Sequence, residues 1–491
     1  MFIRRLHKFS YNPQYKLKCG LEIHTQLKTK YKLFSLSPTS SNEPANTKLS
    51  YFDVGLPGTQ PKLNPEALLL ALRASVAFNS EIQPYSSFDR KHYFYPDQPL
   101  GYQITQHYYP LAKNGYLELN KYDNIKDKRI RLEQIQLEQD TGKTVNYDDR
   151  INVDYNRANT PLIEVVTKPD FENIEQVQAF VRKYQLIVSH LDICTGELET
   201  GAMRVDANIS VNGNPRVEIK NLGSSGEIVD ALQFEYMRQV RLLQNGQGIN
   251  QETRGWTGEG TESLRSKENA VDYRYVPDSE LPAIRLDQQI TKQLQKSLPE
   301  LPDTILERLI NKPYNLDLAH AKNLLYQPEV LKYYETIFAS ISSNANKWFF
   351  QELLAAFAKR GVEFDVDIVP PSMLVDIVKK VETEEISLAA ARIILKYIVE
   401  NKSTNTLVEL VEILDLKKPE ANDELQLAVK EICQQIIKNN PEVVTKIANG
   451  HKNALQVLIG QAMKATKGKV HAKDFKEQFI ELLKQIRIII K

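Results

Sequence analysis

The amino-acid sequence predicts an α+β protein in which a sheet-containing N-terminal part precedes a part made of helices alone. From about residue 17 to residue 286 the chain is rich in Tyr, Val, Ile, Gly and Pro, and apolar and polar residues alternate in short stretches. Such alternation is typical of half-buried strands. From Gln289 onward apolar residues recur with a helical period between prolines. A chain of 491 residues exceeds one ordinary core, so we expect two or three domains.

Local patterns place the elements of the N-terminal part. We expect strands at 18–26, 151–155, 202–211 and 216–220, where every second residue is apolar. We expect helices at 65–79, 174–191 and 228–243. The first begins with a proline, the second follows an acidic turn and the third follows a Gly-Ser-Ser-Gly loop. The alternation favours a largely antiparallel sheet.

The N-terminus predicts mitochondrial import. Residues 1–18 contain five Lys or Arg residues, and no acidic residue precedes Glu22, which is typical of a leader that directs a protein to the matrix. A basic tail on a cytosolic protein is the alternative. We therefore divide the chain into an import leader at 1–18, a sheet-containing domain at 19–290, a helical domain at 291–420 and a basic helical tail at 421–491.

Composition narrows the class of protein. The net charge is only +1, so a nucleic-acid partner has to be met by a local basic patch. Residues 441–491 carry ten Lys or Arg against four acids, a local charge of +6, although a solvated helical surface is the alternative. Three widely spaced cysteines suit a reducing compartment better than a disulfide scaffold or a C-x-x-C metal site. No apolar run has the length of a membrane span.

The familiar nucleotide-binding loops are absent from the sequence. Thr-Gly-Lys-Thr at 141–144 resembles the end of a Walker A loop, but Leu137 stands where that loop needs glycine. The glycines of 255–260 have the wrong spacing for a dinucleotide fingerprint. Any ATP site must therefore be of another design.

Four strand-like stretches carry polar residues two positions apart. The pairs are Glu22 with His24, Glu138 with Asp140, Asp206 with Asn208, and Glu218 with Lys220. Residues two apart on a strand share a face. Carboxylates and an imidazole gathered in this way suit Mg²⁺, which takes one or two carboxylates with phosphate oxygens and water, and Lys91 or Lys220 could meet the phosphates as a point charge. The alternative is four solvated sheet faces, because the sequence does not show that these strands are neighbours.

An aromatic and cationic stretch occupies residues 88–97. Its sequence, F-D-R-K-H-Y-F-Y-P-D, fits stacking on an exposed nucleotide and contact with phosphate, with Arg90, Tyr93 and Tyr95 as candidate nucleic-acid contacts. An aromatic-rich turn packed on a sheet is the alternative. Asp154 and Glu164 flank Pro161 in what we expect to be another polar loop.

Long motifs in the same order make the chain resemble the GatB/GatE family, the B subunits of tRNA-dependent amidotransferases. The resemblance extends through nearly the whole chain. The matching motifs are G-L-E-I-H-T-Q-L at 20–27, F-D-R-K-H-Y-F-Y-P-D at 88–97, G-Y-Q-I-T-Q at 101–106, L-E-Q-D-T-G-K at 137–143, D-Y-N-R-A-N-T-P-L-I-E at 154–164, M-R-V-D-A-N-I-S at 203–210, V-E-I-K-N-L at 217–222, D-Y-R-Y-V-P at 272–277 and G-Q-A-M-K-A-T-K-G-K at 460–469.

Two stretches depart from the family pattern. The family usually reads H-L-E-E-D where this chain reads Q-L-E-Q-D at 136–140, so Gln136 and Gln139 are not expected to be ligands. The usual K-N-L-N-S-F is K-N-L-G-S-S at 220–225, which implies a rebuilt loop after the sheet.

The resemblance implies an activity and a set of site residues. ATP would phosphorylate the γ-carboxylate of glutamate on misacylated tRNA(Gln), and ammonia would then displace the phosphate to give Gln-tRNA(Gln). By resemblance, Glu22, His24 and Glu138 hold Mg²⁺. Glu138, Lys91, Asp206, Glu218 and Lys220 are the implied catalytic residues, and the last four also line the nucleotide and acyl group. The family further implies a cradle-shaped catalytic domain, a helical domain and a mobile tail, in which Lys464, Lys467 and Lys469 are candidate tRNA contacts.

The resemblance also implies partners. The sequence shows no Ser/Lys amidase signature, and its cysteines have no evident triad partners, so ammonia has to come from an A-type amidase subunit. A small third subunit, of the C type or a fungal replacement, is expected to join the two. The alternatives are a non-catalytic tRNA-binding scaffold and the same enzyme acting on Asp-tRNA(Asn).

Overall fold

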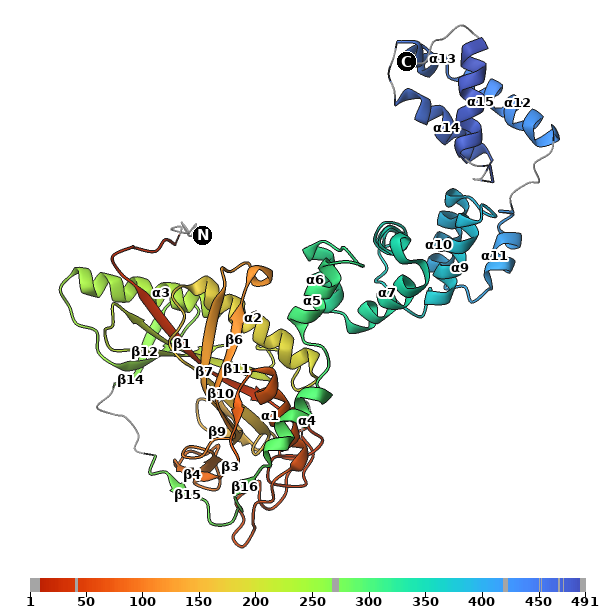
Figure 1. Ribbon diagram of the computed structural model, residues 1–491. Coiled ribbons are helices and arrows are strands. Elements are labelled where there is room, and N and C mark those ends of the chain that lie inside the picture. The colour runs from red at the N-terminus through yellow and green to blue at the C-terminus, as the bar shows by residue number, and fades with distance from the viewer. Residues whose placement is uncertain are drawn as a thin grey trace. The chain divides into compact units, whose positions relative to one another are not determined.

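The computed structural model describes residues 9–39, 43–266, 273–417, 423–449, 451, 453–466, 469–470 and 472–485. The chain forms two compact units, Met1–Ile305 and Leu306–Lys491 (Figure 1). The first contains a large, mostly antiparallel sheet with helices, and the second is helical. The predicted α+β class, with helices alone in the C-terminal part, is therefore confirmed.

The first unit is organised around a sheet whose described strands run in the order β14-β13-β12-β11-β1-β10-β7-β6-β2. Their bounds are β1 Leu17–Gln26, β2 Glu81–Ile82, β6 Ala112–Leu119, β7 Lys128–Gln139, β10 Pro161–Thr167, β11 Met203–Val211, β12 Val217–Leu222, β13 Glu252–Trp256 and β14 Thr261–Ser266. All neighbouring pairs are antiparallel except β12 with β13. The long helix between β12 and β13 provides the crossover that a parallel pair requires.

Helices cover the apolar face of this sheet. Helices α2 (Ile174–His190) and α3 (Ser225–Gln244) lie side by side across it (Figure 1), and α1 (Pro65–Ala77) packs near β2 and β7. Each helix begins at a side-chain cap, from Asn64, Asn173 or Ser224. In β1, Leu21 and Ile23 are buried in the core, so the intervening Glu22 and His24 occupy the opposite face.

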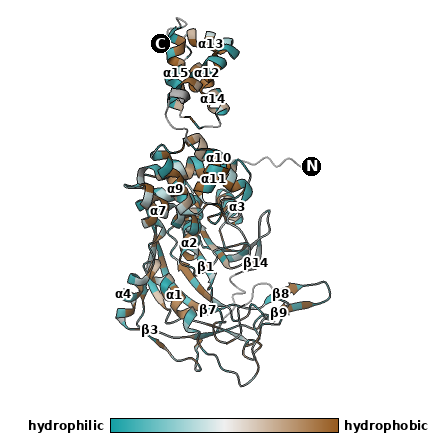
Figure 2. Ribbon diagram, turned by 90° about the vertical axis from the view of Figure 1, so that its right-hand side faces the viewer, coloured by the Kyte–Doolittle hydropathy of each residue, from teal (hydrophilic) through white to brown (hydrophobic). Residues whose placement is uncertain are grey.

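Smaller sheets flank the polar side of the main sheet. One contains β15 (Val276–Pro277), β4 (Asp89–His92) and β5 (Tyr102–Thr105), and β5 packs against β7. A second pairs β16 (Ile284–Arg285) with β3 (Tyr85–Ser86). The hairpin of β8 (Lys143–Asn146) and β9 (Ile151–Asp154) extends away from the body of the unit (Figure 2).

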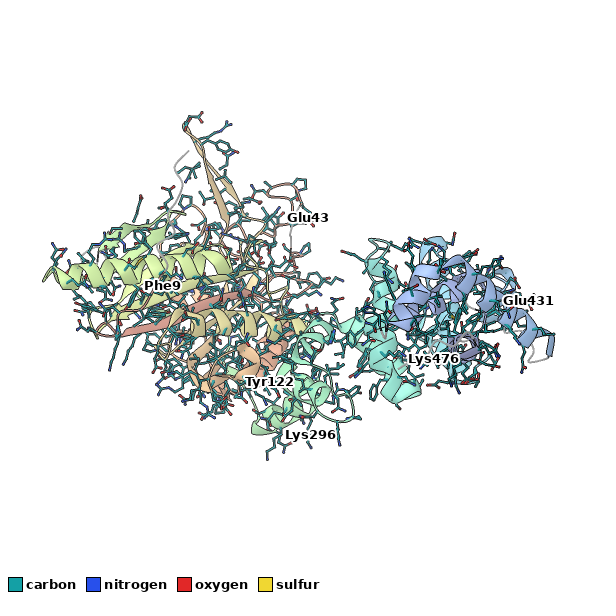
Figure 3. The ribbon with its side chains drawn as sticks, turned by 90° about the horizontal axis from the view of Figure 1, so that it is seen from above. Phe9, Glu43, Tyr122, Lys296, Glu431 and Lys476 are labelled. Atoms are coloured by element: carbon teal, nitrogen blue, oxygen red, sulfur yellow. The ribbon has the colours of Figure 1, made fainter. Side chains whose placement is uncertain are left out.

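The N-terminal segment before β1 packs against α2 and α3. Phe9 lies beside α3 (Figure 3), in edge contact with Tyr236. The Tyr236 hydroxyl accepts a hydrogen bond from the backbone of Asn12 at 3.1 Å and donates one to the carbonyl of Tyr15 at 2.9 Å. The Tyr11 hydroxyl accepts the Ile174 backbone hydrogen bond at the start of α2. Residues 9–16 of the expected leader are thus packed on the sheet domain, whereas residues 1–8 lie outside the described part.

The remaining elements are mainly helical, as the sequence predicted from Gln289 onward. The first unit also contains η1 (Lys121–Asp123) and α4 (Gln288–Ser297), and α5 (Pro302–Ile310) spans the boundary between the two units. The second unit continues with α6 Leu318–Leu325, α7 Pro328–Ile341, η3 Ser342–Asn344, the π-helix η4 Lys347–Leu353, α8 Leu354–Ala358, α9 Pro371–Glu382, α10 Leu388–Asn401, α11 Leu407–Ile413, α12 Asp423–Asn439, α13 Pro441–Ala448, α14 Ala454–Ala465 and α15 Ala472–Gln485. Prolines occupy the first turn of α7, α9 and α13.

The tail helices α12–α15 share a hydrophobic core of their own, which includes Cys433, Leu458 and Phe475.

The domain limits at 290/291 and 420/421 stay predictions. In the described part of the chain, no helix has the length and apolarity needed to cross a membrane.

Candidate active site

The strand register brings the predicted polar pairs onto one face of the sheet. Across β1, His24 is paired with Glu164 of β10 on one side and with Arg204 of β11 on the other, while Glu22 is paired with Asp206. Paired residues of adjacent strands point to the same face. We call this surface the polar face, and define it by Glu22, His24, Glu138, Glu164, Arg204, Asp206, Asn208, Glu218 and Lys220.

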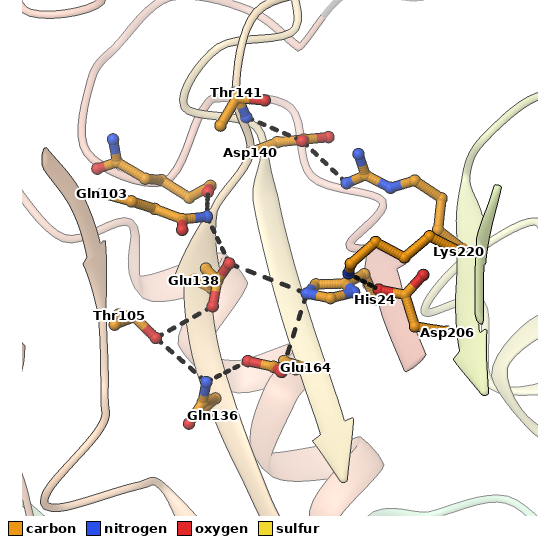
Figure 4. Close-up of polar contacts among 12 residues, drawn as sticks. His24, Gln103, Thr105, Gln136, Glu138, Asp140, Thr141, Glu164, Asp206 and Lys220 are labelled. Carbon is orange, nitrogen blue, oxygen red and sulfur yellow. Dashed lines mark hydrogen bonds and ion pairs between the residues drawn. The ribbon is translucent and has the colours of Figure 1, made fainter. Parts of the chain in front are cut away.

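A first cluster on the polar face contains His24, Glu138 and Glu164 (Figure 4). The Nε2 atom of His24 lies 3.9 Å from Glu138 Oε1 and 3.9 Å from Glu164 Oε1. Each of the three residues offers one ligand atom, and all three atoms lie within 4.8 Å of one another. An imidazole and two carboxylates at this spacing could share one divalent cation.

Neighbouring amides and hydroxyls hold the two carboxylates in place (Figure 4). Thr105 on β5 donates a hydrogen bond to Glu138 Oε2 at 3.1 Å, and Gln103 donates to Glu138 Oε1. Gln136 donates to Glu164 and also contacts the Thr105 hydroxyl at 3.2 Å. The glutamine that replaces the family's usual histidine at position 136 therefore supports a site carboxylate. Such supporting contacts orient the groups that bind a ligand.

The pKa values of the two glutamates of this cluster are shifted in opposite directions. Burial raises the pKa of Glu164, and the negative charge of Glu138 raises it further, so that it lies well above the ordinary range. Burial acts on Glu138 in the same direction, but the positive charge of Lys91 and the contact with His24 outweigh it, and the pKa of Glu138 is lowered. Burial lowers the pKa of Lys91, but the charge of Glu138 and the interactions with Glu164, Tyr273 and Tyr275 together more than offset this, so the net shift is upward.

These shifts fit a cation site. Two buried carboxylates this close repel each other when both are ionised, and this repulsion is one cause of the raised pKa of Glu164. A divalent cation among His24, Glu138 and Glu164 would compensate the negative charges. The residues present therefore fit Mg²⁺.

A second cluster contains Glu22, Asp206 and Glu218, whose carboxylates also approach within 4.8 Å of one another. Lys220 fills it, since its Nζ lies 2.6 Å from Asp206 and 2.9 Å from Glu218. Burial lowers the pKa of Lys220, but the two carboxylates more than offset this and raise it above the ordinary value. This cluster therefore presents a fixed ammonium group to the polar face.

Asn208 contributes an unused acceptor to the second cluster. Its side-chain nitrogen donates to Glu22 at 3.0 Å, whereas its buried Oδ1 has no partner among the described residues. A buried acceptor without a donor is costly unless a ligand or water satisfies it.

A third group fixes an arginine between the two clusters. Asp140 is buried just beyond the end of β7 and accepts hydrogen bonds from Arg204 at 2.8 Å and from Gln26 at 3.1 Å. Arg157 lies 3.7 Å from the same carboxylate. Burial raises the pKa of Asp140, but Arg204 and Arg157 lower it by more, so the carboxylate stays ionised. Asp140 thus aligns the Arg204 guanidinium with the polar face.

The structure brings together most of the predicted site. Glu22, His24, Glu138, Asp206, Glu218 and Lys220 share the polar face, and Lys91 approaches it from β4. Glu22 is grouped with Asp206 and Glu218, whereas His24 and Glu138 are grouped with Glu164.

The sequence interpretation missed two residues of this face, Glu164 and Arg204. Glu164 was expected in a polar loop beside Pro161, and that expectation is wrong because Pro161 is the first residue of β10. A proline is tolerated at a strand start, so it was not the loop signal that it resembled. The apolar, largely β-branched or aliphatic run of Pro161–Thr167, in which Glu164 is the charged member, was the signal that could have found Glu164. For Arg204, the spacing of two from Asp206 was the available signal.

The predicted tRNA contacts have varied surroundings. Arg90 pairs with Asp278 at 2.6 Å and lies over the Tyr102 ring, while Tyr93 and Tyr95 contact each other with ring centroids 5.2 Å apart. In the tail, Lys464 is exposed, and Lys469 pairs with Asp415. Lys467 lies outside the described residues. Their role in tRNA binding stays a prediction.

Comparisons with known proteins find two family matches and several close relatives. Residues 17–292 match the family described as the GatB/GatE catalytic domain, and residues 332–483 match the one described as the GatB domain. A Candida albicans (strain WO-1) protein named as the mitochondrial B subunit of glutamyl-tRNA(Gln) amidotransferase is 78% identical over 484 residues, which cover 99% of each chain. Proteins of the same name from Candida dubliniensis and Lachancea thermotolerans are 77% and 44% identical. They cover 99% and 97% of this chain, and the matches extend over 95% and 94% of those proteins.

Proposed function

Because this chain belongs to the GatB/GatE family, we propose that it acts in mitochondria as the B subunit of a glutamyl-tRNA(Gln) amidotransferase. The family matches and the mitochondrial relatives support this assignment. In this role the chain converts Glu-tRNA(Gln) into Gln-tRNA(Gln) for translation, using ATP and ammonia.

The proposed reaction has two steps, phosphorylation of the carboxylate and displacement of the phosphate by ammonia. A γ-carboxylate oxygen of the glutamyl group attacks the terminal phosphorus of ATP, and the bond from that phosphorus to the bridging oxygen breaks, which releases ADP. Ammonia then attacks the γ-carbonyl carbon, phosphate leaves with the oxygen that came from the carboxylate, and a proton is lost from nitrogen. Phosphorylation is needed because an unactivated carboxylate oxygen is a poor leaving group.

The polar face supplies groups for both steps. His24, Glu138 and Glu164 would hold Mg²⁺, which supplies charge neutralisation for the transferred phosphoryl group. Lys91, Arg204 and Lys220 present positive charge to phosphate and carboxylate oxygens. Asp206 and Glu218 hold Lys220 in place, and Asp140 holds Arg204.

One observation carries this assignment. The cluster of His24, Glu138 and Glu164 lies on the same sheet face as the cations, aligned by strand pairing (Figure 4). Mixed acidic and basic groups that gather at the centre of a polar sheet face are poorly explained by packing, and pKa values shifted in opposite directions are typical of functional sites.

Partners complete the proposed enzyme. An A-type amidase subunit releases ammonia from glutamine, and a small third subunit joins it to this chain. The residues of 19–290 act as the catalytic domain, those of 291–420 as a helical connection, and the basic residues of 421–491 contact the tRNA.

The test is an amidation assay with purified protein, Mg²⁺, ATP, ammonium chloride and Glu-tRNA(Gln), with the amidase partner added where solubility requires it. Glu138→Gln is expected to reduce the rate of Gln-tRNA(Gln) formation about tenfold to a hundredfold, because it removes a ligand from the cation site. Glu133→Gln changes an exposed glutamate of the same strand and serves as the matched control, with activity retained.

The outcomes separate the hypotheses. ATP-dependent amide formation that requires Glu138 supports the proposal. Bound tRNA with neither ATP turnover nor amide would reduce the chain to a scaffold, and full activity of Glu138→Gln would refute the cation site. Amide formed on Asp-tRNA(Asn) at a comparable rate would broaden the substrate.

A further inference from the structure

Exposed and half-buried aromatic rings gather beside the polar face, where the loop after β5 meets the segment before β15. The rings of His107 and Tyr275 are stacked, with centroids 3.9 Å apart and planes 9° from parallel. Tyr108 contacts both rings edge-on, and its hydroxyl donates to the Tyr275 carbonyl at 3.3 Å. A face-to-face pair held in this way forms a flat platform.

Core packing does not account for this platform. His107, Tyr108 and Tyr275 are absent from the described hydrophobic core of the unit and from the partly buried residues packed against it. His107 and Tyr108 are exposed, the latter by 49%. Aromatic rings ordered by one another at a wet surface are typical of binding sites.

The platform is continuous with the proposed site. The Nζ atom of Lys91 lies 4.8 Å from the centre of the Tyr273 ring, and Tyr273 contacts Tyr275 edge-on. The same lysine interacts electrostatically with Glu138 and Glu164. These aromatic rings therefore adjoin the lysine that faces the carboxylates.

We propose that the His107–Tyr275 platform, together with Tyr108, binds the single-stranded 3′ end of the aminoacylated tRNA by base stacking. The inference rests on the proposed function and deepens it. Unpaired bases stack on aromatic side chains regardless of their identity, and flanking cations meet the phosphates. A terminal nucleotide on the platform places its attached glutamyl group toward Lys91 and the polar face.

The extent of the aromatic surface favours a strand over a single adenine ring of ATP. Beyond Tyr108, the exposed Tyr109 packs edge-on against Tyr85 with centroids 5.2 Å apart. The guanidinium of Arg285 lies 5.5 Å from the centre of the Tyr85 ring. Further rings and a cation next to Tyr108 suit successive nucleotides and their phosphates.

The test measures KM for Glu-tRNA(Gln) and KM for ATP separately in the complete amidotransferase supplied with ammonium chloride. Tyr275→Ala is expected to raise KM for Glu-tRNA(Gln) about five- to 150-fold, the range for removal of one base stack, and to leave KM for ATP in place. Tyr275→Phe is expected to recover the affinity, because it restores the ring. Tyr326→Ala removes an exposed tyrosine ring from the helical unit and serves as the control.

A second readout uses a single-stranded oligonucleotide with the sequence of the tRNA 3′ end as a competitive inhibitor. It is expected to inhibit the wild type more strongly than Tyr275→Ala. A rise in KM for ATP alone, a rise in both constants, or no change in either would overturn the inference, as would a Tyr275→Phe variant as impaired as Tyr275→Ala. Each of these results leaves wild-type amidation intact, whereas failure of the proposed function would abolish amide formation in the wild type itself.

Discussion

At the scale of single residues, the site depends on how each charge is compensated. The positive charges of Lys91 and His24 lower the pKa of Glu138 in spite of its burial, whereas burial and the negative charge of Glu138 raise the pKa of Glu164. The buried Asp140 pairs with Arg204, whose partly exposed guanidinium reaches the polar face. Removing one member of such a pair leaves an uncompensated charge, which costs more than the pair contributes.

The raised pKa of Glu164 predicts a pH dependence of stability in the metal-free protein. A carboxyl whose folded pKa exceeds its unfolded pKa binds more protons in the native state, so stability falls as pH rises from the unfolded toward the folded value. Glu164→Gln is expected to remove this loss. At pH values above the folded pKa, the free energy of unfolding of the variant should exceed that of the wild type. The difference is about 1.4 kcal/mol for each unit by which the folded pKa is raised.

Urea unfolding of both proteins across pH, with a chelator present, measures the effect. In a second series without chelator, added Mg²⁺ is expected to stabilise the wild type and to have little effect on Glu164→Gln. Parallel pH profiles for the two proteins would contradict the assigned protonation.

Sequence patterns predicted which of these residues share a face, but not which strands are neighbours. Glu22 with His24 and Glu218 with Lys220 obey the two-residue period. The grouping of Glu22 with Asp206 and Glu218 depends on strand order, which local patterns do not contain. Arg204 was missed because its function depends on Asp140, a residue of a distant segment.

At the scale of elements, the predicted bounds were close wherever the pattern was local. β1 begins one residue before the predicted strand and ends at the same residue, and α2 covers the predicted helix except its last residue. The parallel pairing of β12 with β13 and the small sheet formed by β15, β4 and β5 were not predicted. Such pairings join segments far apart in the chain and leave no periodic signal.

The N-terminal segment yields a prediction at this scale. The Tyr11 hydroxyl accepts from the Ile174 backbone at 2.6 Å and donates to Glu175 at 2.9 Å, so it links the segment to the first turn of α2. Tyr11→Phe is expected to destabilise the protein by about 1–2 kcal/mol, because it leaves a helix-start donor without its acceptor.

Thermal or urea unfolding checks this, with Tyr15→Phe as the matched control. The Tyr15 ring packs on the core, but its hydroxyl has no hydrogen-bond partner among the described residues. Equal stability of Tyr11→Phe and Tyr15→Phe would show that the segment contributes only through its rings.

At the scale of the whole molecule, sequence composition separated a sheet-containing part from a helical one, and the two compact units have this character. The basic tail has its own described core, so its charges occupy an independently packed surface. Composition could not show whether those charges serve tRNA binding, because a solvated helical surface has the same composition.

The tail yields a prediction for binding. Removing residues 423–491 is expected to weaken the affinity for Glu-tRNA(Gln) and to make it less dependent on salt. The slope of log affinity against log salt concentration should become shallower by roughly 0.7–0.9 for each phosphate that the tail neutralises. Lys464→Ala, which changes one exposed residue, is expected to give a fraction of this effect. Filter binding at several salt concentrations measures both. Unchanged slopes with normal amidase binding would show that the tail is only a solvated surface.

The central claim is that this chain activates the γ-carboxylate by phosphorylation. The most direct measurement uses Glu-tRNA(Gln) whose γ-carboxylate carries ¹⁸O, with ATP, Mg²⁺ and ammonium chloride, followed by mass analysis of the released phosphate. The account predicts that each amide formed transfers one labelled oxygen to phosphate, and that Glu138→Gln reduces label transfer and amide together. Amide formed with unlabelled phosphate would contradict it.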